Sequence, residues 1–396
     1  MSRLPRVKDI RHVAIWGQTR DGGLGMSSTD GLATAGSAVT FKEGRRLGML
    51  AGVVALALVA FGWAAPRAHA AADPNHVSFT LEGCRLPAGA TLPNGSGKFI
   101  CPDAQYTTGN LGKSYNELDL VPHRLTAANG NGDQTYAVVI AADNLKGGAP
   151  GYDVISVPEV NTLLSTNAGA GCAVAAGPQT PLAPGVGGAD ATIYRTLTIT
   201  QAAGSTCVFD YYERLALGSH LYSGSSLHSN LLNQQLTSAG IGSKDVSIPV
   251  KQIQPQGLAK TMSATQGSSS VWKVTKESSP SHLYFDTCSG GQDNALAQGV
   301  TITVSWDKIT TFADKVTILT NITVTNPAHR TITATVNDKV YEGAGQSTTP
   351  VEYTFPATDV PANSEVVLKH TYTVDASDAT QYNDVATAKY TDKVTG

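Results

Sequence analysis

The sequence predicts an all-β protein, in which an N-terminal β module that contains disulfides precedes an immunoglobulin-like (Ig-like) β-sandwich. Short runs of β-branched and aromatic residues alternate with Gly, Pro and Asn turns along most of the chain. Threonine occurs 44 times, and 21 of these lie in the last 96 residues, where β-branched side chains suit a pleated, half-buried surface. Charged residues make up only 15% of the 396 residues, compared with roughly 25% in an average domain.

The chain begins with an expected disordered extension over residues 1–41 and a secretory signal over residues 42–70. Arg45 and Arg46 precede the apolar run 47–65, which small residues follow. This basic, apolar, small-residue order is typical of a signal peptide, with cleavage expected between Ala70 and Ala71. An uncleaved membrane anchor remains open, because the run approaches the roughly 20 residues that span a bilayer.

After residue 70 the chain is acidic, with 19 basic and 27 acidic side chains. No series of basic residues interleaved with aromatics remains to follow a phosphate backbone, so we expect no nucleic-acid partner. We expect contact with a membrane only through the signal segment.

All five cysteines lie after the signal, and export to an oxidising compartment favours disulfides. Proximity in sequence suggests pairing Cys84 with Cys101 and Cys172 with Cys207, although sequence alone fixes no connectivity. Cys288 is then the candidate free thiol. No C-x-x-C or paired-histidine spacing is present, so we expect no metal and no cofactor.

Residues 71–250 are expected to form the N-terminal module. Strand-like segments are separated by turns, among them the loops 127–133 and 143–151, whose Asn-Gly and Gly-Gly steps supply positive φ. Only residues 159–166 and 227–236 have the composition of short helices. Many short strands between regular turns favour a sandwich or barrel.

Residues 251–269 lose periodicity and are interpreted as a linker, and residues 270–396 as the Ig-like domain. Seven strand-like segments in about 125 residues match such a sandwich. Side chains two apart on a strand share a face, so Ile302, Val304 and Trp306 are expected to face inward.

Parts of the chain resemble Ig-like and prealbumin-like repeat domains of secreted and surface actinobacterial proteins. The matching features are Asn326 in a turn, Asp338 on the next strand, the corner 361–364 and the strand segment 383–387. The resemblance implies a structural or adhesin-like protein on the bacterial cell surface or secreted from the cell. It supplies no catalytic residues, and we expect no enzyme.

The resemblance also suggests a covalent cross-link. Some bacterial surface sandwiches join a lysine on the first strand to an Asn or Asp on the last, because desolvation favours the neutral, nucleophilic amine. Lys276 with Asn383 or Asp384 is the candidate isopeptide pair, and the sequence does not identify the assisting carboxylate.

Two alternatives remain. A secreted carbohydrate-binding module needs exposed aromatics, for which Tyr211, Tyr212 and Tyr222 are the nearest cluster. A secreted hydrolase would use His220 or His228 with nearby Ser and Asp residues, but no G-x-S-x-G elbow supports it. The expected partner is an unidentified host, matrix or glycan ligand.

Overall fold

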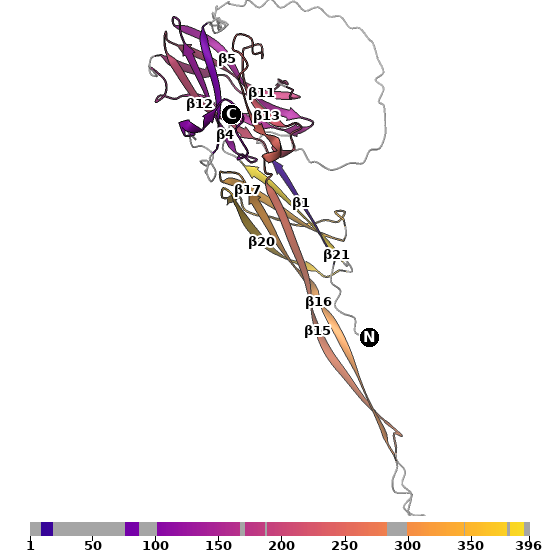
Figure 1. The fold of residues 1–396 in the computed structure, drawn as a ribbon. Helices are drawn as coiled ribbons and strands as arrows, with labels where there is room; N and C mark the ends of the chain where they lie inside the picture. The colour runs from indigo at the N-terminus through magenta and orange to yellow at the C-terminus, as the bar shows by residue number, and fades with distance from the viewer. Residues whose placement is uncertain are drawn as a thin grey trace, which may run out of the picture. The chain divides into compact units, whose positions relative to one another are not determined.

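The structure is a computed structural model that describes residues 9–18, 76–86, 101–166, 171–186, 188–282, 299–343, 345–377 and 381–391. Within these ranges the protein is all-β, which confirms the predicted fold class. None of the helical segments described is long and apolar enough to cross a membrane. The chain divides into two compact units. The N-terminal module contains the described residues of 17–255 with 327–330, and the C-terminal sandwich contains those of 1–16, 256–326 and 331–391 (Figure 1).

The described residues of the N-terminal module form two antiparallel sheets, with three short 3₁₀ turns outside the strands. The first sheet contains β5 (Gln134–Lys146), β6 (Ala149–Pro150), β9 (Cys172–Ala176), β10 (Thr180–Pro184), β11 (Ala191–Gln201), β13 (Ser226–Leu232) and β14 (Asp245–Pro249). The second contains β2 (Val77–Cys84), β3 (Tyr106–Thr107), β4 (Leu120–Asn129), β7 (Tyr152–Ile155), β8 (Glu159–Val160) and β12 (Thr206–Leu215). The 3₁₀ turns are Asp103–Gln105, Ser219–Leu221 and Val250–Gln252.

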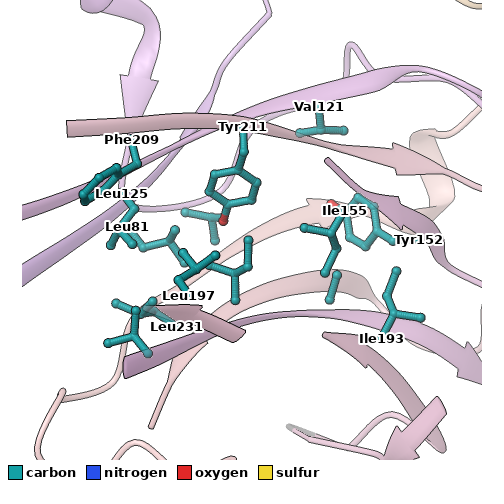
Figure 2. Close-up of a cluster of buried hydrophobic side chains, with 14 of the residues drawn as sticks. Leu81, Val121, Leu125, Tyr152, Ile155, Ile193, Leu197, Phe209, Tyr211 and Leu231 are labelled. Atoms are coloured by element: carbon teal, nitrogen blue, oxygen red, sulfur yellow. The ribbon is translucent and has the colours of Figure 1, made fainter. Parts of the chain in front are cut away.

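The core of the module lies where the inward side chains of these two sheets meet. Figure 2 shows Leu125 and Phe209 from the second sheet near Leu197 and Leu231 from the first. All four side chains are fully buried. They alternate with outward-facing neighbours because successive strand residues point to opposite faces.

Both segments expected to form short helices are extended or turn structure instead. Residues 226–232 form β13, which pairs with β5 and β14. Its buried residues Leu227 and Leu231 are four positions apart and therefore lie on the same face of the strand. Only Glu159 and Val160 of the other segment form a strand, and turns follow. Backbone pairing with neighbouring strands outweighs weak local helix propensity. The Gly147-Gly148 turn after β5 has positive φ at both residues, as predicted, whereas Gly130 and Gly132 of the other predicted loop do not. Residues 127–129 and 143–146 of the two predicted loops belong to strands.

The C-terminal sandwich also has two sheets. One contains β15 (Gly257–Ser279), β16 (Thr301–Asn326) and β20 (Ser364–Asp375). The other contains β1 (Asp9–Gln18), β17 (Ile332–Glu342), β18 (Val351–Thr354), β19 (Thr358–Val360) and β21 (Gln381–Thr391).

Two sequence-based boundaries differ from these elements. Asp9–Gln18, inside the extension expected to be disordered, forms β1 beside β21. Its Ile and Val residues favour strand formation, and the edge of β21 supplies unpaired backbone groups. β15 begins at Gly257, inside the expected linker 251–269, because regular pairing with β16 compensates for its small and polar residues.

The strands β15 and β16 extend past the rest of their sheet as a two-stranded hairpin (Figure 1). β20 pairs with β16 only from Lys315 to Asn326. The expectation that Ile302, Val304 and Trp306 face inward is therefore wrong, since they are 53%, 46% and 65% exposed. The alternation was interpreted correctly, but none of the described strands forms a second sheet over this part of the hairpin.

Candidate functional site

Three charged side chains meet inside the C-terminal sandwich. Lys260 lies on β15, in the inward row with Leu258 and Met262. Asp338 lies on β17 and Asp384 on β21, and both take inward positions in strands that otherwise bury apolar residues. Asp338 is opposite Ala386, so the two carboxyl groups are diagonal neighbours on one sheet face. Lys260 reaches them from the other sheet.

The Lys260 amine contacts both carboxyl groups directly. Its Nζ lies against Oδ1 of Asp338 and Oδ1 of Asp384, and all three side chains have no exposed surface. Burying charged groups costs several kcal/mol per ion unless they are well paired. A lysine and two carboxyl groups held together out of water therefore need either a tight ionic arrangement or a covalent bond.

Hydrogen bonds fix the orientation of Asp338. Its Oδ2 accepts from Thr320 Oγ1 at 3.0 Å and from Tyr372 OH at 2.9 Å, while its Oδ1 faces the amine. Burial raises the pKa of Tyr372, and the Asp338 charge adds to this effect, so the phenol stays protonated and donates. Asp338 Oδ2 thus accepts from two side-chain hydroxyl groups, while Oδ1 contacts the lysine nitrogen.

Asp384 has a different environment. Burial, followed by repulsion from Asp338, raises its pKa to about 7, although Lys260 opposes the shift. Its Oδ2 is buried and has no hydrogen-bond partner. Its surroundings favour an uncharged carboxyl group beside the lysine, which is the electrophilic form for acyl transfer to an amine.

Of the three residues that the sequence suggested for an isopeptide bond, only Asp384 lies in this cluster. Lys276 is exposed on the extended hairpin, opposite Val304, and the Asn383 amide donates to the Gly345 carbonyl at 3.3 Å. Lys260 lay in the expected linker and was missed, yet its alternation with Leu258 and Met262 was a readable signal for an inward lysine.

The disulfides match the pairing expected from proximity. Cys84 joins Cys101, with Cα atoms 6.0 Å apart, and Cys172 joins Cys207, with Cα atoms 5.6 Å apart. The second bond connects β9 of the first sheet to β12 of the second. Such bonds persist in oxidising compartments and are consistent with an extracellular location. The candidate free thiol Cys288 and the cleavage site Ala70 and Ala71 lie outside the described residues.

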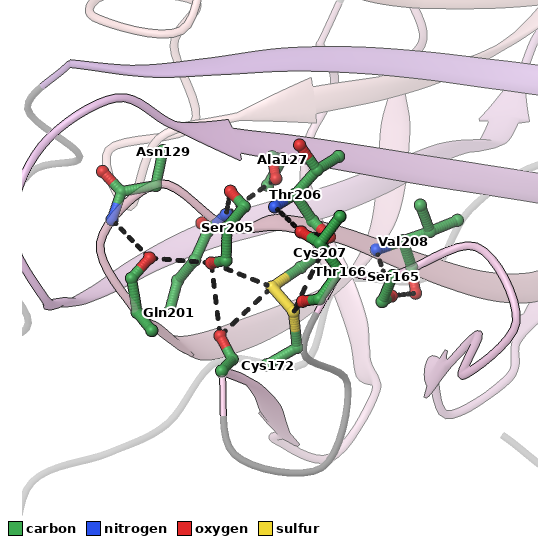
Figure 3. The surroundings of a disulfide bond; sticks show 12 residues. Ala127, Asn129, Ser165, Thr166, Cys172, Gln201, Ser205, Thr206, Cys207 and Val208 are labelled. Atoms are coloured by element: carbon green, nitrogen blue, oxygen red, sulfur yellow. Dashed lines mark hydrogen bonds between the residues drawn. A yellow bond between two sulfur atoms is a disulfide. The ribbon is translucent and has the colours of Figure 1, made fainter.

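Polar contacts next to the second disulfide support the edge of β12. Figure 3 shows the backbone N–H groups of Thr206 and Val208, which donate to Thr166 Oγ1 at 2.6 Å and to Ser165 Oγ at 2.9 Å. Side chains here take the place of a neighbouring strand, so the unpaired backbone groups are satisfied.

The residues considered for a hydrolase are held by separate partners. His220 Nδ1 lies 2.5 Å from Glu117 Oε1, and His228 Nδ1 lies 3.2 Å from Asp143 Oδ2. Tyr211 and Tyr222 are each only 4% exposed, and Tyr212 is partly buried against the core, so the three form no exposed aromatic platform for a sugar.

A second buried pair in the N-terminal module is uncharged. Glu213 Oε1 accepts from Ser229 Oγ at 2.8 Å, and Oε2 lies 3.8 Å from Nε2 of His123. Burial lowers the pKa of His123 to about 4. Burial, with a contribution from the Asp143 charge, raises the pKa of Glu213 well above its ordinary value. Both groups are thus neutral at mildly acidic pH, and their contact is not an ion pair.

This pair predicts a stability that depends on pH. Because the folded module holds the Glu213 proton, its contribution is complete below the unfolded pKa of about 4.3 and is lost as pH rises toward the folded value. We expect Glu213→Gln to become more stable relative to the wild type by up to about 1.4 kcal/mol per pH unit in this window. Urea unfolding at pH 5, 7 and 9 measures the difference, and a constant difference would contradict the assignment.

No family model matches this chain, and no curated protein matches it significantly. Its function is therefore inferred from the fold and the residues described above.

Proposed function

We propose that this is a non-catalytic structural or adhesin-like protein of the bacterial cell surface, whose C-terminal sandwich is closed by an isopeptide bond between Lys260 and Asp384. The observation that carries the proposal is the fully buried cluster of Lys260, Asp338 and Asp384. It combines an amine, a carboxyl group whose pKa is raised to about 7 and a nearby proton acceptor within contact distance.

The reaction needs no outside reagent. The Lys260 ammonium gives one proton to the Asp338 carboxylate, and the free amine attacks Cγ of the neutral Asp384 carboxyl group. The new C–N bond forms as the C–O bond breaks, and the second amine proton leaves with the hydroxyl group as water. Asp338 ends protonated, which balances the charge. The geometry holds the reacting groups together, and such proximity replaces a large part of the barrier.

The two ends of the bond make it structurally useful. Lys260 belongs to β15 and Asp384 to β21, and 124 positions separate them in the sequence. The bond would join the two facing sheets and enclose nearly the whole sandwich in one covalent loop. A bond in this place restricts the unfolded chain, and residues 260–384 cannot be fully extended unless an amide is broken. This suits a protein that works outside the cell, where no chaperone system with ATP refolds it.

Export is part of the proposal. The basic and apolar segment at residues 42–70 supports secretion, and the two disulfides agree with it. The resemblance to actinobacterial repeat proteins supports a place on the cell surface, with a host, matrix or glycan ligand. Of the tyrosines considered for a carbohydrate-binding module, Tyr211 and Tyr222 lie in the core and Tyr212 is partly buried against it. A glycan array tests this alternative directly.

Mass spectrometry of the purified protein tests the bond. We expect the intact mass to be lower by one water than the mass calculated with two disulfides, and a tryptic digest to contain a branched peptide that joins Lys260 to Asp384. Asp338→Asn removes the proton acceptor and should restore the missing water. Lys315→Ala changes an exposed lysine paired with Asp375 and should leave the wild-type mass deficit. A full calculated mass in the wild-type protein would refute the cross-link.

A further inference from the structure

The outer part of the long hairpin has an apolar face that the described residues leave uncovered. We call residues 268–279 and 301–312 the distal ribbon. Here β15 and β16 pair only with each other, because the contact of β20 with β16 begins at Lys315. An isolated two-stranded ribbon is only marginally stable in water. Such a ribbon gains stability when one of its faces is covered.

The pairing register separates the residues of the distal ribbon into two faces. Residues directly opposite each other share a face, and Trp272 is opposite Lys308 while Val274 is opposite Trp306. The apolar face carries Trp272, Val274, Ile302, Val304, Trp306 and Phe312. The polar face carries Ser, Thr, Lys, Asp and Glu side chains, with Val271 opposite Ile309 as its one apolar pair.

The exposed apolar area is large. Trp272, Trp306 and Phe312 are 58%, 65% and 55% exposed. With roughly 150–250 Å² for each aromatic side chain, these three alone expose on the order of 300 Å². Val274, Ile302 and Val304 are also about half exposed or more and enlarge this area. Contiguous exposed patches larger than a few hundred Å² mark sites of protein or membrane interaction.

The charges on this face select the partner. Its only ionisable side chains are Lys276 and Lys308, and it carries no carboxylate. Lys308 lies 6.0 Å from the centre of the Trp272 ring. Stacking two copies face to face would bring four lysines together without a counter-charge, which disfavours a second copy. A partner that is apolar and anionic fits both properties.

We propose that the apolar face of the distal ribbon docks onto an anionic lipid bilayer. Tryptophan prefers the boundary between headgroups and acyl chains, and lysines beside it contact anionic headgroups. Open backbone groups at the ribbon edges cannot enter the hydrocarbon. The ribbon therefore lies flat in the headgroup region, with its polar face toward water. This contact is independent of the isopeptide bond and adds to the one expected from the signal segment.

A fluorescent label on either face tests the proposal in the full chain. Two labelled variants are compared. One carries the label at Ser270→Cys on the apolar face and the other at Ser269→Cys on the polar face, and Cys288→Ser is present in both. Vesicles of phosphatidylcholine with phosphatidylglycerol are compared with phosphatidylcholine alone. We expect the label at 270 to shift to the blue and to become several-fold less accessible to iodide, only with the anionic vesicles. The label at 269 should stay accessible. Because neighbouring positions are compared, membrane binding by another segment cannot mimic the result.

Matched double variants show which side chains cause the protection of the label at position 270. Trp272→Ser with Trp306→Ser should abolish protection at position 270, whereas Val271→Ser with Ile309→Ser on the polar face should retain it. Lys276→Gln with Lys308→Gln should weaken vesicle partitioning about fivefold per lysine. Equal accessibility at 269 and 270 would overturn the proposal. So would a blue shift without vesicles that grows with protein concentration, which would instead assign the face to a second copy.

Discussion

Lys260→Ala should lower the free energy of unfolding of the C-terminal sandwich by about 5 kcal/mol or more. A cross-link that closes a loop of this length stabilises the fold by about 5 kcal/mol through the entropy of the unfolded chain. The variant also leaves the carboxyl groups of Asp338 and Asp384 buried without the lysine nitrogen that contacts them, and an unpaired buried polar group costs roughly 1–3 kcal/mol. Because both effects act in the same direction, the sandwich should unfold well below the wild-type temperature or fail to fold.

Calorimetry and urea unfolding measure this loss, and Lys315→Ala is the matched control. Lys315 also pairs with an aspartate in this sheet, Asp375, but both side chains are mostly exposed, and surface pairs contribute little. Asp338→Asn keeps the size of the side chain while blocking the cross-link, so a folded variant with reduced stability is expected even if Lys260→Ala does not fold. Unfolding of Asp338→Asn identical to the wild type would contradict the proposed role of the cluster.

Removing the Cys172–Cys207 bond should cost the N-terminal module about 4 kcal/mol. The bond encloses 35 positions, and loop entropy gives this magnitude. It also joins the two sheets whose facing side chains form the core, and Cys207 is fully buried. The Cys84–Cys101 bond encloses 17 positions and should contribute about 3 kcal/mol.

Paired alanine variants, one pair at a time, separate the two disulfides in thermal unfolding. We expect the wild type to have the highest melting temperature, the variant without Cys84–Cys101 a lower one, and the variant without Cys172–Cys207 the lowest. Reducing agent should lower the melting temperature of the wild type and leave the double-pair variant unchanged. If both single-pair variants have the same melting temperature as the wild type, the stability of the native fold does not depend on either bond.

The sequence indicated the β class because alternation and turn residues are local properties. The Gly147-Gly148 turn and the nearest-neighbour cysteine pairs were predictable for the same reason. Whether a face is covered depends instead on distant strands. Trp306 follows an inward pattern yet lies on a part of the hairpin that no described strand covers, and Leu227 pairs in a sheet although its neighbours suit a helix.

The candidate site shows the same limit. Asp384 was predicted as a cross-linking residue, but its lysine partner was placed at Lys276 because that residue stands in the strongest strand pattern of the region. Lys260 lies in a stretch of small and polar residues that carries little hydrophobic signal. Its partners come from β17 and β21, and only the packing of two sheets brings them within reach.

The position of the distal ribbon along the chain has a mechanical consequence. Its residues all lie between Lys260 and Asp384, inside the loop that the proposed amide closes. Tension applied to the two ends of the chain would then pass from β15 to β21 through that amide and bypass the intervening strands. The ribbon would carry no load, so its Trp272 and Trp306 face would keep its shape while the rest of the molecule is pulled.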